Sequence, residues 1–129
     1  MKGNVETYRS DAKCIENVPM VILTDGSTAS AAELFTSTLR DYKYATVVGT
    51  KTYGKGCGQT FYPMSNGGYV KLTTFLYSPP YSDNYDGIGI YPDVEVDLEG
   101  DAAEKNLFLV TYEEDAPLQT AVQILTENK

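Results

Sequence analysis

The sequence predicts an α/β fold in which helices pack on a mixed β-sheet. Two continuous apolar runs, PMVILT at 19–24 and ATVVG at 45–49, are typical of buried strands, and apolar residues recur at helical spacing between them. Two β-like segments further along flank an Asn-Gly-Gly turn at 66–68, which is a strong hairpin signal. The 129 residues fit a single domain, 1–129, that is long enough to bury a core without metals or disulfides.

The first half of the chain is predicted to form one strand–helix–strand unit. Val5–Arg9 alternates weakly between polar and apolar residues, which favours a short strand. The run at 19–24 is followed by turn formers and then by a helix within 29–43, whose apolar residues share one face. The run at 45–49 then returns as a second buried strand, so we expect the unit to be a right-handed crossover.

The second half is predicted to hold a hairpin, a long loop and a final helix. The two hairpin strands, the loop and a short strand after it are expected at 58–64, 69–77, 78–93 and 94–96. The loop, SPPYSDNYDGIGIYPD, has a length that is more often functional or mobile than part of a core. The last helix falls within 114–128, with Asp115 as its cap and Pro117 in its first turn.

The composition argues against several classes of function. The net charge is −8 and the ten Lys and Arg residues are scattered, so we expect no nucleic-acid partner. No apolar run is long enough to span a bilayer. The first residues lack the apolar segment of a signal peptide, so no signal peptide is expected in this chain. The two cysteines, Cys14 and Cys57, are expected to be unpaired thiols. The chain has no histidine, which removes Ser-His-Asp catalysis, Cys-His catalysis and the usual zinc sites within it.

The stretch VVGTKTYGKG at 47–56 is similar to a phosphate-binding loop. Gly49, Gly54 and Lys55 have the G-x-x-x-x-G-K spacing, but Gly56 stands where a Ser or Thr should bind magnesium. A phosphate loop also needs a helix directly after the lysine, whereas the residues that follow are glycine-rich and β-like. A nucleotide site is therefore disfavoured.

Lys55 can instead serve as a general base. A lysine removed from water loses its proton more readily, because desolvation disfavours the charged form. A suitable partner is a serine at a turn before a helix, where backbone N–H groups can hold an oxyanion, and the segment GSTASAAE at 26–33 is such a place. Ser27 or Thr28 is expected to be the helix N-cap. Ser30 is a candidate nucleophile, although Glu33 three residues later also fits a capping box.

These motifs together resemble the signature of the carboxyl-terminal processing proteases, also called tail-specific proteases. The segment GSTASAAELFTSTLRDYKYATVVGTKTYGKGCGQ resembles their G-S-A-S-A-S-E motif, the helix that ends in Asp-Tyr, and the motif V-V-G-x-x-[TS]-[FY]-G-K-G-x-x-Q. Downstream, NGGYVKLTTFLYSPP, GIGIYPDVEV and DAPLQTAVQIL resemble further segments of that family in the same order. The resemblance covers residues 19–125.

The resemblance implies roles for individual residues. Ser30 matches the nucleophile, Lys55 the general base, and Gln59 the amide that orients the lysine. Ala31 matches the residue whose backbone N–H contributes to the oxyanion hole. Asp41 matches an acidic residue implicated in some members, but we favour a structural role for it at the end of the helix. The serine motif is one residue longer than the family pattern, which leaves Ser27 as a second candidate nucleophile.

The resemblance also implies the function and the setting. We expect a ClpP/crotonase-like protease core, in part, that acts as a Ser-Lys serine endopeptidase on polypeptides near their C-termini, outside the cytoplasm, with no metal or organic cofactor. Members of that family also have an N-terminal half of the core, which the resemblance implies as the source of a second oxyanion donor. They usually have a PDZ domain that captures substrate tails as well. This sequence has no match to either part. The isolated chain is therefore expected to fold, to lack activity, and to self-associate or exchange strands through uncovered sheet surface.

Two other functions stay open on the sequence alone. The chain could be a non-catalytic peptide-binding or scaffold fragment of the same fold, in which the Tyr/Pro-rich loop at 78–93 binds extended peptide. It is also similar in fold class to the related acyl-CoA hydratase-like family, but the sequence shows no feature directed at coenzyme A.

Overall fold

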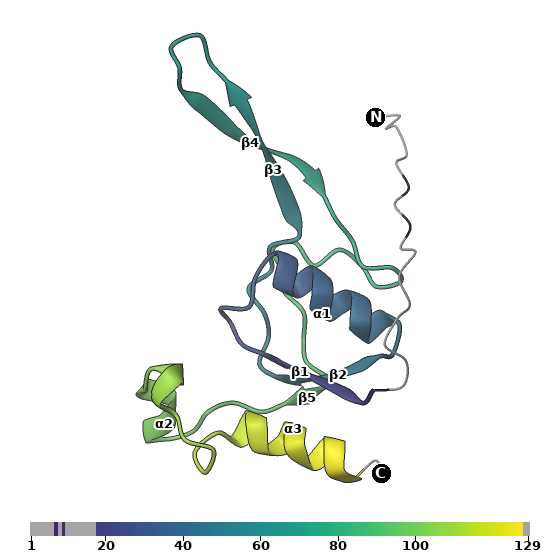
Figure 1. The fold of residues 1–129 in the computed structure, drawn as a ribbon, viewed down its shortest axis with the longest axis vertical. Coiled ribbons are helices and arrows are strands. Elements are labelled where there is room, and N and C mark those ends of the chain that lie inside the picture. The colour runs from purple at the N-terminus through teal and green to yellow at the C-terminus, as the bar shows by residue number, and fades with distance from the viewer. Residues whose placement is uncertain (1–6, 8, 10–17, 128–129) are drawn as a thin grey trace.

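The computed structural model describes residues 7, 9 and 18–127, and the strand expected at Val5–Arg9 lies mostly outside them (Figure 1). The described part is built around three parallel strands: β1 (Met20–Thr24), β2 (Ala45–Gly49) and β5 (Val94–Glu95) in the order β1-β2-β5. The expected strand–helix–strand unit is confirmed as β1, α1 (Ala31–Asp41) and β2.

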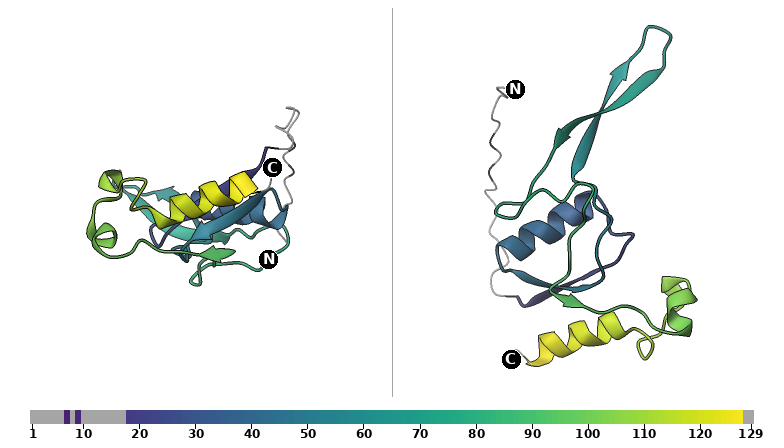
Figure 2. Two further views of the ribbon diagram at one scale, coloured as in Figure 1. Left: turned by 90° about the horizontal axis from the view of Figure 1, so that it is seen from below. Right: turned by 180° about the vertical axis from the view of Figure 1, so that it is seen from behind.

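Two helices cover the parallel sheet from opposite sides. Figures 1 and 2 show α1 on one face and α3 (Ala116–Glu127) on the other, and the two helices pack against β2, with α3 also packing against β1. The apolar run of β2 is therefore buried from both sides, and Val47 and Val48 have no exposed surface. This explains why two apolar residues, Val47 and Val48, follow one another in ATVVG instead of alternating with polar ones.

The carboxyl end of the sheet is held tightly, and the site is built there. The last residues of β1 and β2, Thr24 and Gly49, are paired in register, and the Thr24 hydroxyl donates to the carbonyl of Thr50 at 3.0 Å. Gly49 has φ +127°, and a Cβ at this position would lie 2.0 Å from the Thr24 carbonyl oxygen. Only glycine fits this close approach, so the chain leaves both strands at a fixed point.

The predicted hairpin is confirmed as β3 (Cys57–Pro63) and β4 (Tyr69–Leu76), an antiparallel pair. It forms a two-stranded sheet of its own that projects away from the layered part of the fold (Figure 1). Parallel and antiparallel pairing therefore both occur, as expected of a mixed fold, but they occur in two separate sheets. Every side chain of β4 is exposed, and the large apolar ones on the hairpin include Phe61, Val70, Leu72, Phe75 and Leu76.

The C-terminal segment contains two short elements that the sequence does not predict. They are α2 (Asp101–Glu104) and a 3₁₀ turn, η1 (Leu107–Leu109), and both are too short to show a hydrophobic period. The expected cap of α3 is confirmed, because the Leu118 N–H donates to the Asp115 carboxylate at 2.8 Å. Within the described residues, no helix has the length and apolar character needed to cross a membrane.

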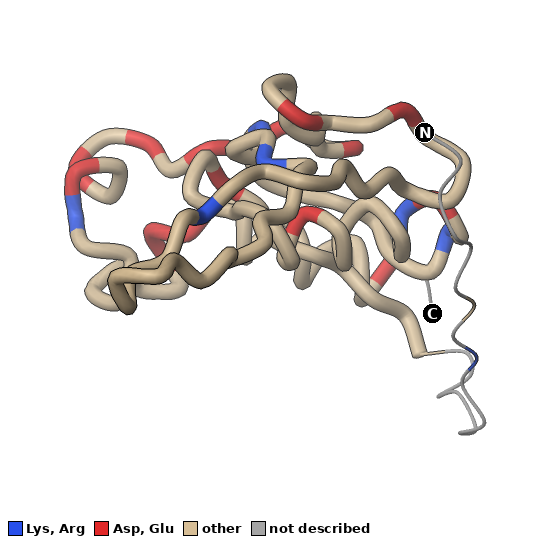
Figure 3. The backbone as a smooth tube through the Cα atoms, turned by 90° about the horizontal axis from the view of Figure 1, so that it is seen from above, with Lys and Arg blue, Asp and Glu red and all other residues tan. Residues whose placement is uncertain are grey.

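Charge is distributed as the sequence suggests. In the part of the chain that the structure describes, acidic residues are spread along most surface segments, and the few Lys and Arg residues lie among them rather than in one basic patch (Figure 3).

Candidate active site

The turn between β1 and α1 is organised by Asp25. Its Oδ1 accepts hydrogen bonds from the backbone N–H groups of Ser27 and Thr28, both at 2.9 Å, and from the Thr28 hydroxyl at 3.1 Å. Ser27 and Thr28 therefore belong to an Asx-type turn, and the expectation that one of them caps the helix is wrong. The N-cap of α1 is Ser30.

Ser30 has a backbone conformation that non-glycine residues rarely adopt. Its φ is 59° and its ψ is −118°, at the sharp change of direction from the turn into α1. Such a conformation costs on the order of 1–3 kcal/mol and persists only where the surroundings enforce it. A serine on a strained turn between a strand and a helix presents its hydroxyl outward, as in a nucleophile elbow.

Glu33 is the residue that enforces this geometry. Its side chain has no exposed surface, and its carboxylate accepts four hydrogen bonds. Oε2 accepts the backbone N–H groups of Ser30 and Lys55, both at 2.8 Å. Oε1 accepts the Thr52 hydroxyl at 2.5 Å and the Gly54 N–H at 2.6 Å. Burial raises the pKa of Glu33, but these four hydrogen bonds outweigh it, so the pKa lies below its ordinary value and the carboxylate is ionised at neutral pH.

The Glu33 carboxylate joins the two segments that the sequence singled out. Because the N–H groups of Ser30 and Lys55 donate to one and the same oxygen, the two backbones lie within two hydrogen-bond lengths of each other. A further bond, from the Tyr53 N–H to the Thr28 carbonyl at 2.9 Å, ties the Lys55 loop to the turn. Residues 25 positions apart in the chain are thus brought to one place.

Tyr77 is a site residue that the sequence reasoning did not identify. Its hydroxyl lies 3.1 Å from the Ser30 Oγ and donates to the Lys55 carbonyl oxygen at 3.0 Å. A tyrosine in the same place within the motif NGGYVKLTTFLYSPP is part of the family resemblance, but nothing in a sequence says that the residue after a hairpin strand returns to a helix N-terminus.

Lys55 is half-buried, and its side-chain amine forms no hydrogen bond or ion pair with any residue that the structure describes. The expected contact with Gln59 is not formed in this arrangement. The Gln59 amide lies close to the Thr73 hydroxyl, at 3.4 Å, and to the Cys57 sulfur, at 3.5 Å. Gln59 therefore lies at the base of the hairpin, and its role in orienting Lys55 stays a prediction.

The Ala31 backbone N–H is available for an oxyanion. Ala31 is the first residue of α1, where an amide has no partner within the helix, and it donates to no other described residue. The side chains of Ala31 and Ala32 are small and exposed, so a carbonyl can approach this amide.

Cys57 is unpaired, as expected, and Cys14 lies outside the described residues. Partial removal from water and the nearby Asp86 carboxylate raise the pKa of the Cys57 thiol, which disfavours the thiolate needed for nucleophilic attack. Among the residues that the structure describes, no three His, Cys, Asp or Glu side chains gather to hold a metal ion.

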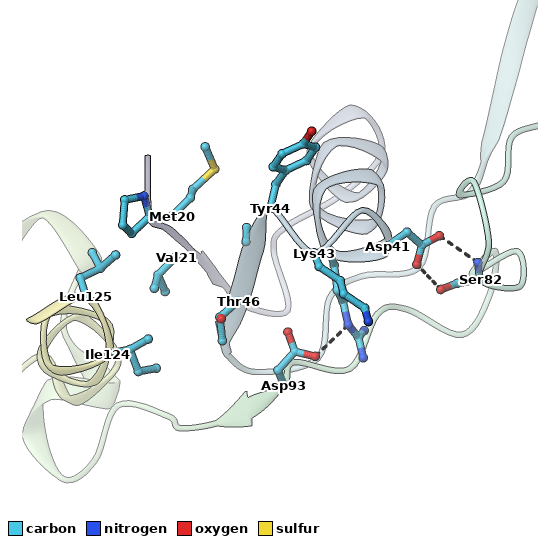
Figure 4. Close-up of a pocket in the computed structure, with 13 residues that line it drawn as sticks. Met20, Val21, Asp41, Lys43, Tyr44, Thr46, Ser82, Asp93, Ile124 and Leu125 are labelled. Atoms are coloured by element: carbon cyan, nitrogen blue, oxygen red, sulfur yellow. Dashed lines mark hydrogen bonds and ion pairs between the residues drawn. The ribbon is translucent and has the colours of Figure 1, made fainter. Parts of the chain in front are cut away.

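Asp41 lies at the opposite end of α1 from Ser30, about 16 Å away for an 11-residue helix. Its Oδ2 accepts the N–H groups of Tyr81 and Ser82, both at 2.8 Å. Its Oδ1 accepts the Ser82 hydroxyl, and Figure 4 shows the two bonds between Asp41 and Ser82. Partial burial raises the pKa of Asp41, but the lowering by these hydrogen bonds and by the Arg40 charge is larger, so the pKa lies below its ordinary value. Asp41 thus fastens the loop at 78–93 to the helix and borders a separate cavity of about 610 Å³.

Comparisons with known proteins agree with the geometry. The sequence profile of Peptidase family S41 matches residues 1–96. A carboxy-terminal-processing protease of Bartonella bacilliformis is 39% identical over 95 residues, which make up 71% of this chain and 22% of the relative. A chloroplastic C-terminal processing peptidase of Tetradesmus obliquus is 35% identical over 99 residues, or 76% of this chain and 21% of the relative.

A solved structure supports the same conclusion. The photosystem II D1 C-terminal processing protease matches with a TM-score of 0.60 and 37% identity, over 63% of this chain and 21% of that one. The expected fold class and the resemblance to carboxyl-terminal processing proteases are confirmed. The chain spans about a fifth of the length of each of these proteins.

Proposed function

The chain belongs to Peptidase family S41, and from this membership and the geometry around Ser30 we propose that it carries the reacting groups of a serine endopeptidase with a Ser-Lys dyad. The observation that supports the proposal best is the shared hydrogen-bond acceptor. A strained Ser30 and the Lys55 loop are held together by one buried carboxylate. Backbone strain that the surroundings enforce is typical of functional sites.

The reaction follows from the residue types present. Lys55 in its neutral form accepts the proton of the Ser30 hydroxyl while Oγ attacks a peptide carbonyl carbon. The Ala31 N–H stabilises the negative charge on the carbonyl oxygen. Lys55 then returns the proton to the leaving amine, and a water molecule hydrolyses the acyl-enzyme by the same steps in reverse order.

The surroundings of Lys55 suit a base. A carboxylate paired with the amine would hold it in the protonated form. Glu33, the nearest buried carboxylate in the hydrogen-bond network, binds the main chain of Lys55 and not its amine. A neutral partner such as Gln59 could orient the amine without adding charge.

The substrates, the setting and the completeness of the site are proposals of the same kind. The names of the relatives describe proteases that process C-termini, one of them chloroplastic. We infer polypeptide substrates cut near their C-termini, and a location outside the cytoplasm. A second oxyanion donor and a PDZ domain would come from residues other than these, so the 129-residue chain by itself is expected to lack turnover.

A non-catalytic, peptide-binding role is the alternative, and one observation favours it. The Tyr77 hydroxyl gives its only proton to the Lys55 carbonyl, so the Ser30 hydroxyl must donate to Tyr77. In this arrangement the serine proton is directed at a tyrosine oxygen instead of the lysine amine.

A fluorophosphonate probe separates the two functions. In the complete natural polypeptide that carries these residues, we expect covalent labelling that Ser30→Ala and Lys55→Ala each abolish. Ser27→Ala is the matched control, because it removes the same atom from the same turn and should leave labelling intact. Labelling that survives Ser30→Ala but not Ser27→Ala would move the nucleophile to Ser27, and a chain that never labels would favour the binding role.

A further inference from the structure

We propose that the Tyr77 hydroxyl is a third catalytic group of this site. It holds the Ser30 Oγ in the resting enzyme and turns to donate a hydrogen bond to that oxygen as the serine loses its proton. This inference rests on the proposed function of Ser30 and Lys55.

The resting arrangement follows from counting protons. A tyrosine hydroxyl has one proton, and here that proton is given to the Lys55 carbonyl at 3.0 Å. The bond of 3.1 Å between Tyr77 and the Ser30 Oγ must then use the serine proton. Tyr77 therefore fixes the position of the Ser30 side chain and connects it directly to the residue that supplies the base.

The position of the Tyr77 hydroxyl does not depend on the serine alone. The Tyr77 N–H donates to the Gly56 carbonyl at 3.0 Å, and the Tyr77 carbonyl accepts the Asn84 amide at 2.6 Å. Its ring packs against the rings of Phe75 and Tyr85, each with a centroid separation of 6.3 Å. These contacts hold the phenol oxygen in place while its hydrogen stays free to rotate.

The change at Tyr77 needs no movement of its own heavy atoms. When Lys55 takes the Ser30 proton, negative charge develops on Oγ, which lies 3.1 Å from the Tyr77 oxygen. Rotation about the C–O bond of Tyr77 redirects its proton from the Lys55 carbonyl to Oγ, and Tyr77 keeps that proton throughout. A hydrogen bond to a charged oxygen is worth roughly twice one between neutral groups, so the new bond favours the transition state over the resting state.

Tyr77→Phe in the complete natural polypeptide tests the proposal, because it removes only the hydroxyl. We expect the rate of Ser30 labelling by the fluorophosphonate, and kcat for a peptide substrate, to fall roughly 10- to 100-fold with KM unchanged, as for the loss of a bond to a charged group. Tyr85→Phe is the matched control. It removes the same atom from the neighbouring ring, where the buried hydroxyl has no partner among the described residues, and should change the rate by less than about twofold.

A double-mutant cycle on stability gives a readout that does not need activity. If the two hydroxyls touch, the fold-change in the unfolding constant caused by Ser30→Ala/Tyr77→Phe should differ by more than about twofold from the product of the fold-changes caused by the two single substitutions. Additive effects would show that the contact is absent and would overturn the proposal. If Tyr77→Phe labels and turns over substrate at the rates of the parent while Ser30→Ala is inactive, the proposed role of Tyr77 is overturned and the proposed function of Ser30 stands. No labelling of the parent would instead overturn the proposed function, and the role of Tyr77 with it.

Discussion

Replacing Glu33 by glutamine tests the central interaction of the site by exchanging one carboxylate oxygen for an NH2 group. Glutamine has one acceptor oxygen where the carboxylate has two, and four donors converge on this side chain. If the amide nitrogen takes the place of Oε2, the N–H groups of Ser30 and Lys55 lose their acceptor. If it takes the place of Oε1, the Gly54 N–H does. Either way at least one buried amide is left unsatisfied and the other bonds lose their charge, which should lower the free energy of unfolding by about 3–5 kcal/mol at neutral pH.

The same variant has a signature in the pH dependence of stability. The pKa of Glu33 in the folded protein is below the ordinary glutamate value of 4.5. A lowered pKa means that the stabilisation is fully present above about pH 4.5 and is lost as the pH falls through the folded value. The pKa values of Asp41 and Glu114 are lowered as well, so the parent loses stability in acid for several reasons. The difference between parent and Glu33→Gln isolates Glu33 and should shrink as the pH falls below about 4.5.

Urea unfolding measures both effects. The chain has 11 tyrosines and no tryptophan, so tyrosine fluorescence and far-ultraviolet circular dichroism are suitable probes. Glu113→Gln is the control, because Glu113 is exposed and the structure gives it no hydrogen bond or ion pair among the described residues; it should change stability by less than about 0.5 kcal/mol. A Glu33→Gln protein within about 1 kcal/mol of the parent at pH 7, or a difference that does not shrink in acid, would refute this account.

Four further predictions concern the rest of the site and the chain as a whole. Lys55→Arg should be as damaging to activity as Lys55→Ala, because arginine cannot deprotonate usefully; an active arginine variant would end the general-base assignment. Gln59→Glu should move the pH–activity profile upward by stabilising the charged lysine, and an unmoved profile would mean that the two side chains do not meet in the working enzyme. Asp41→Ala should speed proteolysis of the loop at 78–93 and cost about 1–2 kcal/mol of stability while kcat changes little, whereas loss of kcat in a stable protein would give Asp41 a catalytic role. The isolated 129-residue chain should not cleave peptides and should associate through the exposed hairpin. A peptide-cleavage assay that finds activity, with light scattering that finds a monomer, would contradict both expectations.

The sequence predicts the regular elements of this fold well. The apolar runs, the helical spacing between them and the Asn-Gly-Gly turn are local signals, and β1, α1, β2, the hairpin and α3 all appear where these signals place them. The cap at Asp115 is equally local. The short elements α2 and η1 were missed because a single turn has no period to detect.

The site was harder to predict because its contacts join distant segments. Glu33 looks like half of a capping box, and its bond to the Ser30 N–H fits that pattern. Its three other bonds go to residues 52–55, and only the folded chain shows them. The N-cap was misplaced for a related reason: Asp25 takes the amides of Ser27 and Thr28, so the helix begins later than the first hydroxyl residues suggest.

At position 30, stability and activity favour different amino acids. Glycine would adopt φ 59° and ψ −118° without the cost of a side chain, so a chain selected for stability alone would carry glycine there. Serine keeps the oxygen at the cost of on the order of 1–3 kcal/mol, a burden that the hydrogen bonds of Glu33 are large enough to offset. The buried carboxylate is thus what makes the strained serine tolerable, and a lineage that lost Glu33 would be under pressure to relax residue 30 and give up the hydroxyl with it.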